Sequence, residues 1–291
     1  MSVRLVITDA MWDQIEPLMP ADQVRGRRWA DHRRTLKAIA WKYRTCSPWR
    51  DLPDELGPFQ TAHKRLIRWA MDGTWERILA AVLAAAVLAA ADDAEDLGWT
   101  VSVDSTACRA HQHAAEARRR GRRKSNEPDD HALGRSRGGL STKIHLASNS
   151  RARPFAVHVT AGLAGDAPAF EAVMAGIRVP RNGSGRPRTR PDTVLADRAY
   201  SSRAIRSHLR RRGIHAVIPQ PSDQVGHRLR RGRAGGRPPA FDAEVYKERN
   251  TVERCINQLE QWRGLALRTD KLAIVHQAAL HLAAILVWAR H

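Results

Sequence analysis

Apolar side chains in the first ninety residues recur at the three- and four-residue spacing of amphipathic helices. Four helices are predicted there, and the residues that cap, open or break them are Thr8, Pro20, Asp31, Gly57-Pro58 and Asp72-Gly73-Thr74. Tryptophans gather in the same part of the chain, which suits a small core built from large side chains. We therefore predict an N-terminal helical domain over residues 1–91.

The third predicted helix carries basic side chains, which is typical of the recognition helix in a helix-turn-helix-like domain. We expect this helix to contact DNA through Gln60, Thr61, His63, Lys64, Arg65 and Arg68. A solvated face on a small helical bundle has the same pattern, so the spacing leaves both interpretations open.

After residue 98 the hydrophobic pattern changes to a period of two, which indicates strands. The acidic, polar residues 92–98 between the two patterns are predicted to be a linker. Strands are predicted at residues 99–104, 142–147, 154–160, 193–197 and 215–219, and helices at 166–177, 202–212 and from 244 onward. Residues 99–291 are therefore predicted to form an α/β domain, interrupted by a basic insertion at about 220–243.

The charge balance indicates an anionic partner. The chain has 49 Lys and Arg against 30 Asp and Glu, a formal net charge of +19. Such an excess is usually retained because a polyanion is bound, and the dominance of arginine suits bidentate contacts with phosphate. Two basic stretches, Arg118–Lys124 and Arg228–Pro239, are predicted to be loops that become ordered on a polyanion. Nucleic acid is the first candidate.

Membrane and disulfide-rich classes fit the sequence poorly. The longest apolar run, Leu79–Ala91, is mostly alanine and too short to span a bilayer. The first residues contain no apolar signal segment. Three cysteines without a CxxC pair argue against both a disulfide framework and a thiolate zinc site. We expect a cytoplasmic protein without a membrane partner.

Candidate chemistry lies with three acids that are far apart in the sequence. Asp104 and Asp197 each end a predicted apolar strand, and strand ends are where open α/β sheets place their ligand sites. Either residue alone also fits a turn or a cap. Glu253 follows the second basic stretch, four residues after Arg249, beside an apolar stripe that would dock on the sheet. A surface ion pair between Arg249 and Glu253 fits the same spacing.

Other groups of reactive residues are less informative. His111 and His113 could bind a metal, but no cysteine or HxxxH partner accompanies them in the sequence. Ser105 lacks the GxSxG context of a hydrolase nucleophile, and Gly134–Gly139 lacks the lysine of a phosphate-binding P-loop.

Several longer segments carry a resemblance to a known family. They are CSPWRDLPDELGPFQTAHKRLIRWAMDGTWERI (46–78), VDSTACRAHQHAA (103–115), GRSRGGLSTKIHLA (134–147), LADRAYSS (195–202) and YKERNTVERCINQLEQWRGLALRTDK (246–271). Through these segments the chain resembles, nearly from end to end, the DDE transposases of bacterial insertion sequences, in the group that includes the insertion sequence five family. Long matches in a fixed order are more specific than any single motif.

The resemblance implies an RNase H-like catalytic core, which is a mixed five-stranded sheet with flanking helices. It implies that Asp104, Asp197 and Glu253 are the catalytic, metal-binding triad. The implied cofactor is Mg²⁺, as two ions, for which Mn²⁺ can substitute. General chemistry agrees, because converging carboxylates are hard to keep ionised unless cations lie between them.

The resemblance also implies DNA contacts. Tyr246 and Arg249 match the tyrosine and arginine of the family's signature helix, whereas Glu260 stands where that helix is normally basic. That departure affects one expected contact with the DNA end. The full set of contacts expected from the matched segments is Arg135, Arg137, Lys143, Arg198, Tyr246, Arg249 and Arg254.

The implied function is that of a DNA transposase, which cleaves phosphodiester bonds at the terminal inverted repeats of its element and transfers the 3′-hydroxyl into target DNA. Joining two ends implies a homodimer or a larger assembly on DNA. Two alternatives stay open. One is an inactive or domesticated transposase that only binds DNA, to which Glu260 points. The other is an RNase H-like nuclease acting on a Holliday junction or an RNA–DNA hybrid.

Overall fold

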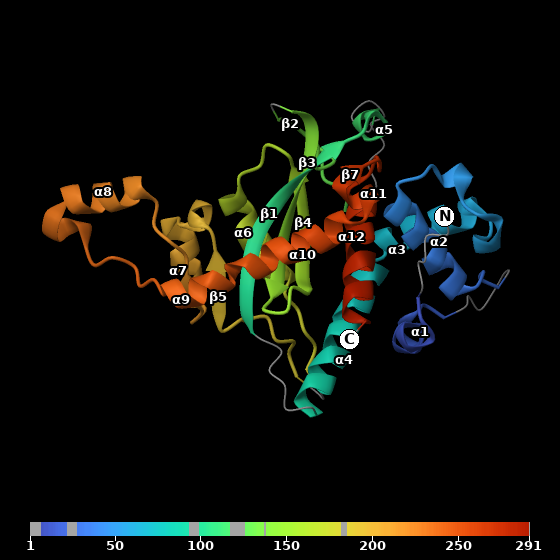
Figure 1. The fold of residues 1–291 in the computed structure, drawn as a ribbon, viewed down its shortest axis with the longest axis horizontal. Helices are drawn as coiled ribbons and strands as arrows, with labels where there is room; N and C mark the ends of the chain where they lie inside the picture. Colours follow the sequence, from blue (N-terminus) through green and yellow to red (C-terminus); the bar gives the residue numbers. More distant parts are fainter. Residues whose placement is uncertain are drawn as a thin grey trace.

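A computed structural model describes residues 7–21, 28–92, 99–116, 126–136, 138–181 and 185–290. A central sheet has the N-terminal helices on one side and an arm that carries helix α8 on the opposite side (Figure 1). Residues 93–98 of the linker predicted at 92–98 lie outside the described residues, as do the basic stretch Arg118–Lys124 and the expected DNA contact Arg137.

The N-terminal part is helical, as predicted. Its elements are α1 (Asp9–Ile15), η1 (Glu16–Leu18), α2 (His32–Thr45), η2 (Trp49–Asp51), η3 (Asp54–Leu56), α3 (Phe59–Met71) and α4 (Thr74–Asp92). The caps were predicted correctly, because Thr8 accepts a hydrogen bond from the amide of Met11 and Asp31 from that of Arg34. Buried tryptophans form the core, with the rings of Trp69 and Trp75 5.3 Å apart.

The connection between α2 and α3 spans residues 46–58 and contains two 3₁₀ turns. A helix-turn-helix joins its two helices by a short turn. Here the tight turn, at Asp72-Gly73, follows α3 and leads into α4. The connection between α2 and α3 is therefore longer than the short turn of a helix-turn-helix, although α3 keeps an exposed basic face.

The sheet is mixed and has β1 (Thr100–Ala110) at its centre. Its other strands are β2 (Gly134–Ser136), β3 (Gly139–Asn149), β4 (Pro154–Ala161), β5 (Thr193–Ala196), β6 (His215–Val217) and β7 (Leu267–Arg268). β3 is antiparallel to β1, and β4 is antiparallel to β3. On the other side of β1, β5 and β6 run parallel to it. These five strands form the predicted mixed sheet. The short strands β2 and β7 were not predicted, because they have too few residues to show a hydrophobic period of two.

β1 is longer than predicted. The sequence pattern placed its end at Asp104, but the strand continues to Ala110. The reason is its antiparallel neighbour, because β3 pairs with β1 from Val101 opposite Asn149 to Arg109 opposite Ser141. Asp104 therefore lies in the middle of a strand, at the level where its parallel neighbour β5 has ended.

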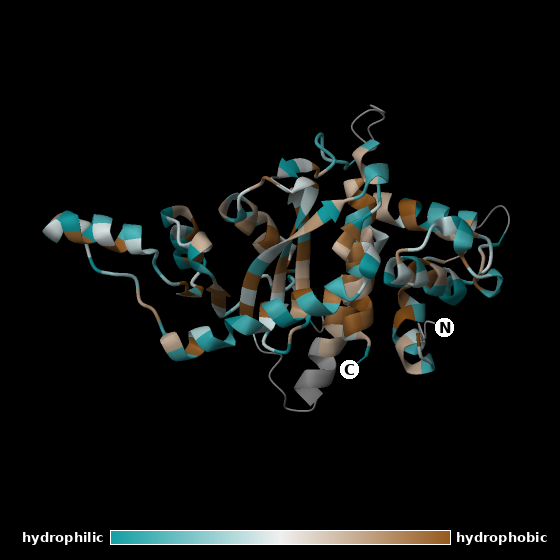
Figure 2. Ribbon diagram, turned by 45° about the horizontal axis from the view of Figure 1, so that its top comes forward, coloured by the Kyte–Doolittle hydropathy of each residue, from teal (hydrophilic) through white to brown (hydrophobic). Residues whose placement is uncertain are grey.

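Helices cover the sheet and connect its parts. They are α5 (Gln112–Ala115), α6 (Asp166–Gly176), η5 (Arg198–Tyr200), α7 (Arg203–Arg211), α9 (Ala243–Tyr246), η7 (Lys247–Arg249), α10 (Asn250–Glu260), α11 (Arg263–Ala266) and α12 (Ala273–Trp288). α12 is buried along nearly its whole length and packs against α2, α3 and α4 as well as β4. Figure 2 shows hydrophobic residues concentrated in the sheet and in this contact layer.

The basic insertion differs from its prediction. Its part Arg228–Pro239 was expected to be a loop, but α8 (Ser222–Arg230) and η6 (Gly232–Gly235) make this stretch largely helical as far as Gly235, and residues 236–239 lack a helix. Gly232, which begins η6 just after the end of α8, has a φ of 54°, in the left-handed region that glycine tolerates. Figure 1 shows α8 projecting from the body, and Figure 2 shows that this arm is mostly hydrophilic.

Within the described ranges, no helix has both the length and the hydrophobicity that a bilayer span requires.

The start of α12 is capped by a buried acid from a distant loop. The carboxylate of Glu127 accepts hydrogen bonds from the backbone amides of Ala273, at 2.7 Å, and Ile274, at 3.1 Å. The Glu127 side chain is fully buried. Removing it leaves two buried donors without an acceptor. We predict that Glu127→Ala lowers the free energy of unfolding by about 3 kcal/mol.

Denaturant unfolding followed by circular dichroism measures this change. Glu116→Ala is the control, since Glu116 forms an exposed ion pair with Lys271 whose loss costs less than about 1 kcal/mol. Equal unfolding midpoints for the two variants would contradict the proposed cap.

Candidate active site

Two of the three predicted acids lie side by side because of strand register. The last parallel pair between β1 and β5 joins Val103 to Ala196. The next residues on the two strands are Asp104 and Asp197, so the two backbones present their acids at the same level. Asp197 also caps the start of η5, because its carboxylate accepts a hydrogen bond from the backbone amide of Ala199 at 2.8 Å.

The third acid comes from α10, and Arg249 connects it to β1. The Arg249 guanidinium donates to Oδ2 of Asp104 at 2.8 Å and to Oε1 of Glu253 at 2.5 Å. The ion pair between Arg249 and Glu253 that the spacing allowed is therefore present, and the same guanidinium also reaches the sheet. Glu253 is half exposed, with 48% of its side chain accessible, whereas Asp104 is 22% accessible.

The helix that carries Glu253 is held on the sheet independently of these charges. Its apolar stripe docks as predicted, with Val252, Leu259 and Trp262 buried. The hydroxyl groups of Ser102 on β1 and Thr251 on α10 are also hydrogen-bonded at 3.2 Å. The position of α10 is therefore fixed by packing and by a neutral hydrogen bond.

Electrostatics show that the acids share one environment. Burial raises the pKa of Asp104, and the nearby charge of Asp197 adds to this, while the Ser105 amide and Arg249 oppose it. The pKa of buried Tyr200 is also raised, first by burial and then by the charges of Asp166, Asp104 and Asp197. Negative charge therefore accumulates around the end of β5.

Among the residues that the structure describes, no three His, Cys, Asp or Glu side chains are close enough together to hold one metal ion. The guanidinium of Arg249 lies between Asp104 and Glu253. The donor set still fits a hard divalent cation, because Mg²⁺ takes carboxylate oxygens and tolerates water at its remaining positions. Asp104, Asp197 and Glu253 are the residues that would hold it.

Sequence reasoning missed Asp166, the first residue of α6. Its carboxylate accepts a hydrogen bond from Oγ of Ser105 at 2.5 Å and forms an ion pair with Nζ of Lys143 at 3.0 Å. Burial raises the pKa of Asp166, but the hydrogen bonds from Ser105 and Lys143 outweigh it and the net pKa is lowered. Its position signalled only a helix start, so no local pattern could have placed it next to β1.

The predicted DNA-contact residues fall into two groups. Those with exposed side chains are Gln60 and Lys64 and Arg68 on α3, Arg135 on β2, Arg198 after β5 and Arg254 on α10. Those that are half buried are Thr61, His63, Lys143, Tyr246 and Arg249. Lys143 is committed to Asp166 and to the carbonyl of Ala164.

Arg65 is not available to a DNA groove, contrary to prediction. Only 9% of it is exposed, and its guanidinium stacks 3.8 Å from the ring centre of Trp29 and 5.1 Å from that of Trp69. It also lies 3.0 Å from Nδ1 of His32. Helical spacing places residue 65 on the face that bears Leu66 and Trp69, so its long side chain packs inward.

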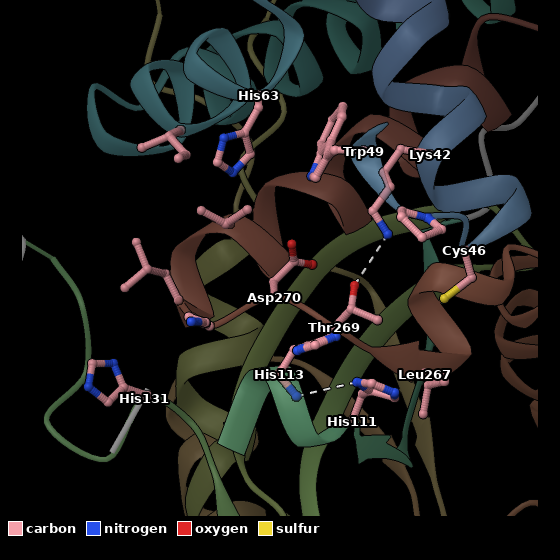
Figure 3. Close-up of a pocket in the computed structure, with 15 residues that line it drawn as sticks. Lys42, Cys46, Trp49, His63, His111, His113, His131, Leu267, Thr269 and Asp270 are labelled. Atoms are coloured by element: carbon pink, nitrogen blue, oxygen red, sulfur yellow. Dashed lines mark hydrogen bonds between the residues drawn. The ribbon is translucent and has the colours of Figure 1, made fainter. Parts of the chain in front are cut away.

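A cavity of about 850 Å³ separates the N-terminal helices from the end of the sheet. Figure 3 shows Lys42, Trp49 and His63 on one side and His111 and His113 on the other. His63 therefore faces this cavity, not an open groove. The imidazole rings of His111 and His113 lie 4.7 Å apart, but no third ligand accompanies them in the described part of the chain. The cavity does not include the acids.

Glu260, at the normally basic position, faces the sheet. Its carboxylate accepts the hydroxyl of Thr106 at 2.9 Å, and the residue is half buried. The side chain is therefore held against β1 two residues beyond Asp104.

Comparison with known proteins identifies the class that this fold and these acids define. Residues 96–288 match the family model "Transposase DDE domain", and residues 7–79 match "Putative transposase of IS4/5 family (DUF4096)". The first match covers more than half of the chain, so the chain belongs to the DDE transposase family. It is a DNA transposase of the insertion-sequence type, as the sequence resemblance implied.

Individual relatives agree with this assignment. The chain is 31% identical over 173 residues, 59% of its length and 72% of the relative's, to the "Putative transposase for insertion sequence element IS402" of Burkholderia cepacia. It is 27% identical over 151 residues, 52% of its length and 100% of the relative's, to the "Putative transposase for insertion sequence element IS6501" of Brucella ovis. A solved structure, "Crystal structure of a pre-cleavage Mos1 transpososome", aligns over 84% of this chain and 81% of that chain. Its TM-score of 0.23 and 11% identity are too low to support a conclusion.

The histidine beside Asp166 provides a test of the environment at this sheet surface. Burial lowers the pKa of His145 to about 4, although Asp166 opposes the shift. The side chain therefore stays neutral in the folded protein at pH values where the same histidine in the unfolded chain, with a pKa near 6.5, is protonated. The unfolded state then binds more protons, and stability from this group is lost as pH falls from about 6.5 toward 4.

We predict that lowering the pH from about 7.5 to about 5.0 reduces the free energy of unfolding of the native protein. The same change in pH should reduce that of the His145→Gln variant by about 1–2 kcal/mol less. Urea titrations at both pH values give the comparison, with exposed His215→Gln as the control that keeps the native pH dependence. The same loss in native and His145→Gln proteins would exclude a buried neutral imidazole.

Proposed function

We propose that Asp104, Asp197 and Glu253 bind two Mg²⁺ ions and catalyse cleavage at the terminal inverted repeats of an insertion element, followed by transfer of the 3′-hydroxyl into target DNA. The observation that carries the proposal is that Asp104 and Asp197 occupy the same register level while Arg249 brings Glu253 toward them. Bound divalent ions supply activation of a hydroxyl and stabilisation of the leaving oxygen in an in-line displacement. Mn²⁺ is expected to substitute.

The protein's own part in this reaction is positioning. Asp104 belongs to β1 and Asp197 directly follows the adjacent strand β5, so both are fixed by the buried sheet. Glu253 belongs to a docked helix whose open face points outward, which leaves room for a DNA strand. Ser105, the residue next to Asp104, donates a hydrogen bond to Asp166, whose carboxylate is paired with Lys143, and this contact helps to fix the middle of β1.

Two basic surfaces on opposite sides of the sheet support DNA binding. One is the exposed part of α3, with Gln60, Lys64 and Arg68, which we propose reads the terminal repeats. The other is the projecting arm, whose arginines are Arg228, Arg230, Arg231, Arg233 and Arg237. Within the described residues, no carboxylate forms a salt bridge with these five arginines, so their charge is available to phosphate. Joining two ends supports a dimer or larger assembly on DNA.

A DNA-binding protein without catalytic activity is the second candidate. The observation that favours it is Glu260, whose acidic side chain is held by Thr106 at a position that is basic in the family. A metal-dependent nicking assay on a duplex that contains the element's end separates the two functions.

We predict that Asp104→Asn, Asp197→Asn and Glu253→Gln each reduce Mg²⁺-dependent nicking by about a thousandfold or more, because each removes a charge that holds the cations. Binding to the end-containing duplex should change little, since the N-terminal helices are untouched. Gel assays of nicking and fluorescence anisotropy of binding measure the two properties. Asp223→Asn on the exposed arm is the matched control. Normal nicking by any of the three variants would refute the triad.

For the arm, we predict that replacing Arg230, Arg231 and Arg233 together by Gln weakens binding to duplex DNA and lowers the slope of log affinity against log salt by about 2–3. Titrations between low and moderate salt give the slope. The control removes the same charge elsewhere, at exposed Arg178, Arg181 and Arg186. An unchanged slope in the arm variant, or an equal fall in the control, would count against the arm as a DNA contact.

A further inference from the structure

Arg249 is a basic residue whose charge points inward, toward two of the predicted acids. Its guanidinium contacts Asp104 and Glu253, and only 20% of its side chain is accessible. Its neighbours Lys247 and Arg254 are exposed. One cation therefore lies between two of the three acids that we propose as metal ligands.

A guanidinium and a divalent cation compete for the same oxygen atoms. Arg249 uses two different nitrogens, Nη1 for Asp104 and Nη2 for Glu253, and so adds a charged link between β1 and α10 to the hydrogen bond between Ser102 and Thr251. A metal ion that binds both carboxylates cannot do so while the guanidinium occupies the space between them. The repulsion between a divalent ion and a guanidinium a few ångströms away adds to this competition.

We propose that Arg249 is a built-in counterion of the acid site, which holds Asp104 and Glu253 together before metal arrives and which a divalent cation must displace. The proposal rests on the proposed metal-binding function of the triad. It makes Arg249 a positioning residue that sets the metal affinity of the site, and its displacement leaves a free guanidinium at the mouth of the site.

The structure provides what this exchange requires. Arg249 is the last residue of η7, directly before α10, so its side chain can turn outward without moving the helix. α10 keeps its buried residues Val252 and Cys255 and the hydrogen bond between Thr251 and Ser102. Loss of the two ion pairs therefore leaves Glu253 attached to a helix in the same place.

The test measures metal binding by the full-length protein, without reference to activity. Isothermal titration with Mn²⁺ is compared between the native protein, Arg249→Gln and the matched control Lys247→Gln, which removes the same charge from an exposed position three residues from its partner Glu244. We expect Arg249→Gln to bind Mn²⁺ about tenfold more tightly, as removal of a coupled competitor allows. Lys247→Gln should match the native protein.

Thermal unfolding in EDTA provides the second readout. Because Arg249→Gln leaves two acids without their counterion, its Tm should lie below that of the native protein in EDTA, and Mn²⁺ should raise it by more than it raises the native Tm. Arg249→Lys keeps a competing charge but loses the two-pronged contact, so its Mn²⁺ affinity should lie between those of the native protein and Arg249→Gln.

The failure of this inference differs from the failure of the proposed function. Equal Mn²⁺ affinity in native protein and Arg249→Gln, with binding still lost in Asp104→Asn, overturns the counterion role and leaves the metal site standing. Weaker Mn²⁺ binding by Arg249→Gln also overturns it. Mn²⁺ binding that is indifferent to Asp104→Asn removes the metal site itself, and the counterion role with it.

Discussion

The structure depends on the pairing of β1 with two different neighbours. On one side β3 runs antiparallel to it along nearly its whole length, and on the other the short β5 runs parallel and stops at Ala196. The unequal lengths leave Asp104 in the middle of a well-fixed strand, next to the residue that follows β5, Asp197. A buried strand that pairs on both sides can hold two like charges close together, where a loop would let them move apart.

Those like charges need compensation, and the chain provides it from different elements. Arg249 lies between Asp104 and Glu253, and Lys143 lies against Asp166. The acidic surface is therefore neutralised in part by its own arginine and lysine. If this site binds divalent cations and DNA, as we propose, internal cations that can change partners would keep its net charge moderate in each state.

The C-terminal helix joins the two parts of the molecule. α12 packs on the N-terminal helices and on the sheet, and Glu127, in the loop before β2, caps its first turn. The N-terminal helical region is thus attached to the catalytic sheet by a long buried helix and not only by the chain between them. Such packing keeps the exposed basic face of α3 at a defined place relative to the acids, on the side opposite to the arm.

The sequence by itself determined the helical N-terminal part, the caps at Thr8 and Asp31, the order of the main strands and the family, because period, capping chemistry and ordered motifs are local properties of the chain. Only the tertiary structure decided where β1 ends, since that depends on β3. It also decided that Arg65 packs between tryptophans and that Asp166 stands beside Ser105. Side-chain partners across the fold are set by strand register and helix docking, which no local pattern contains.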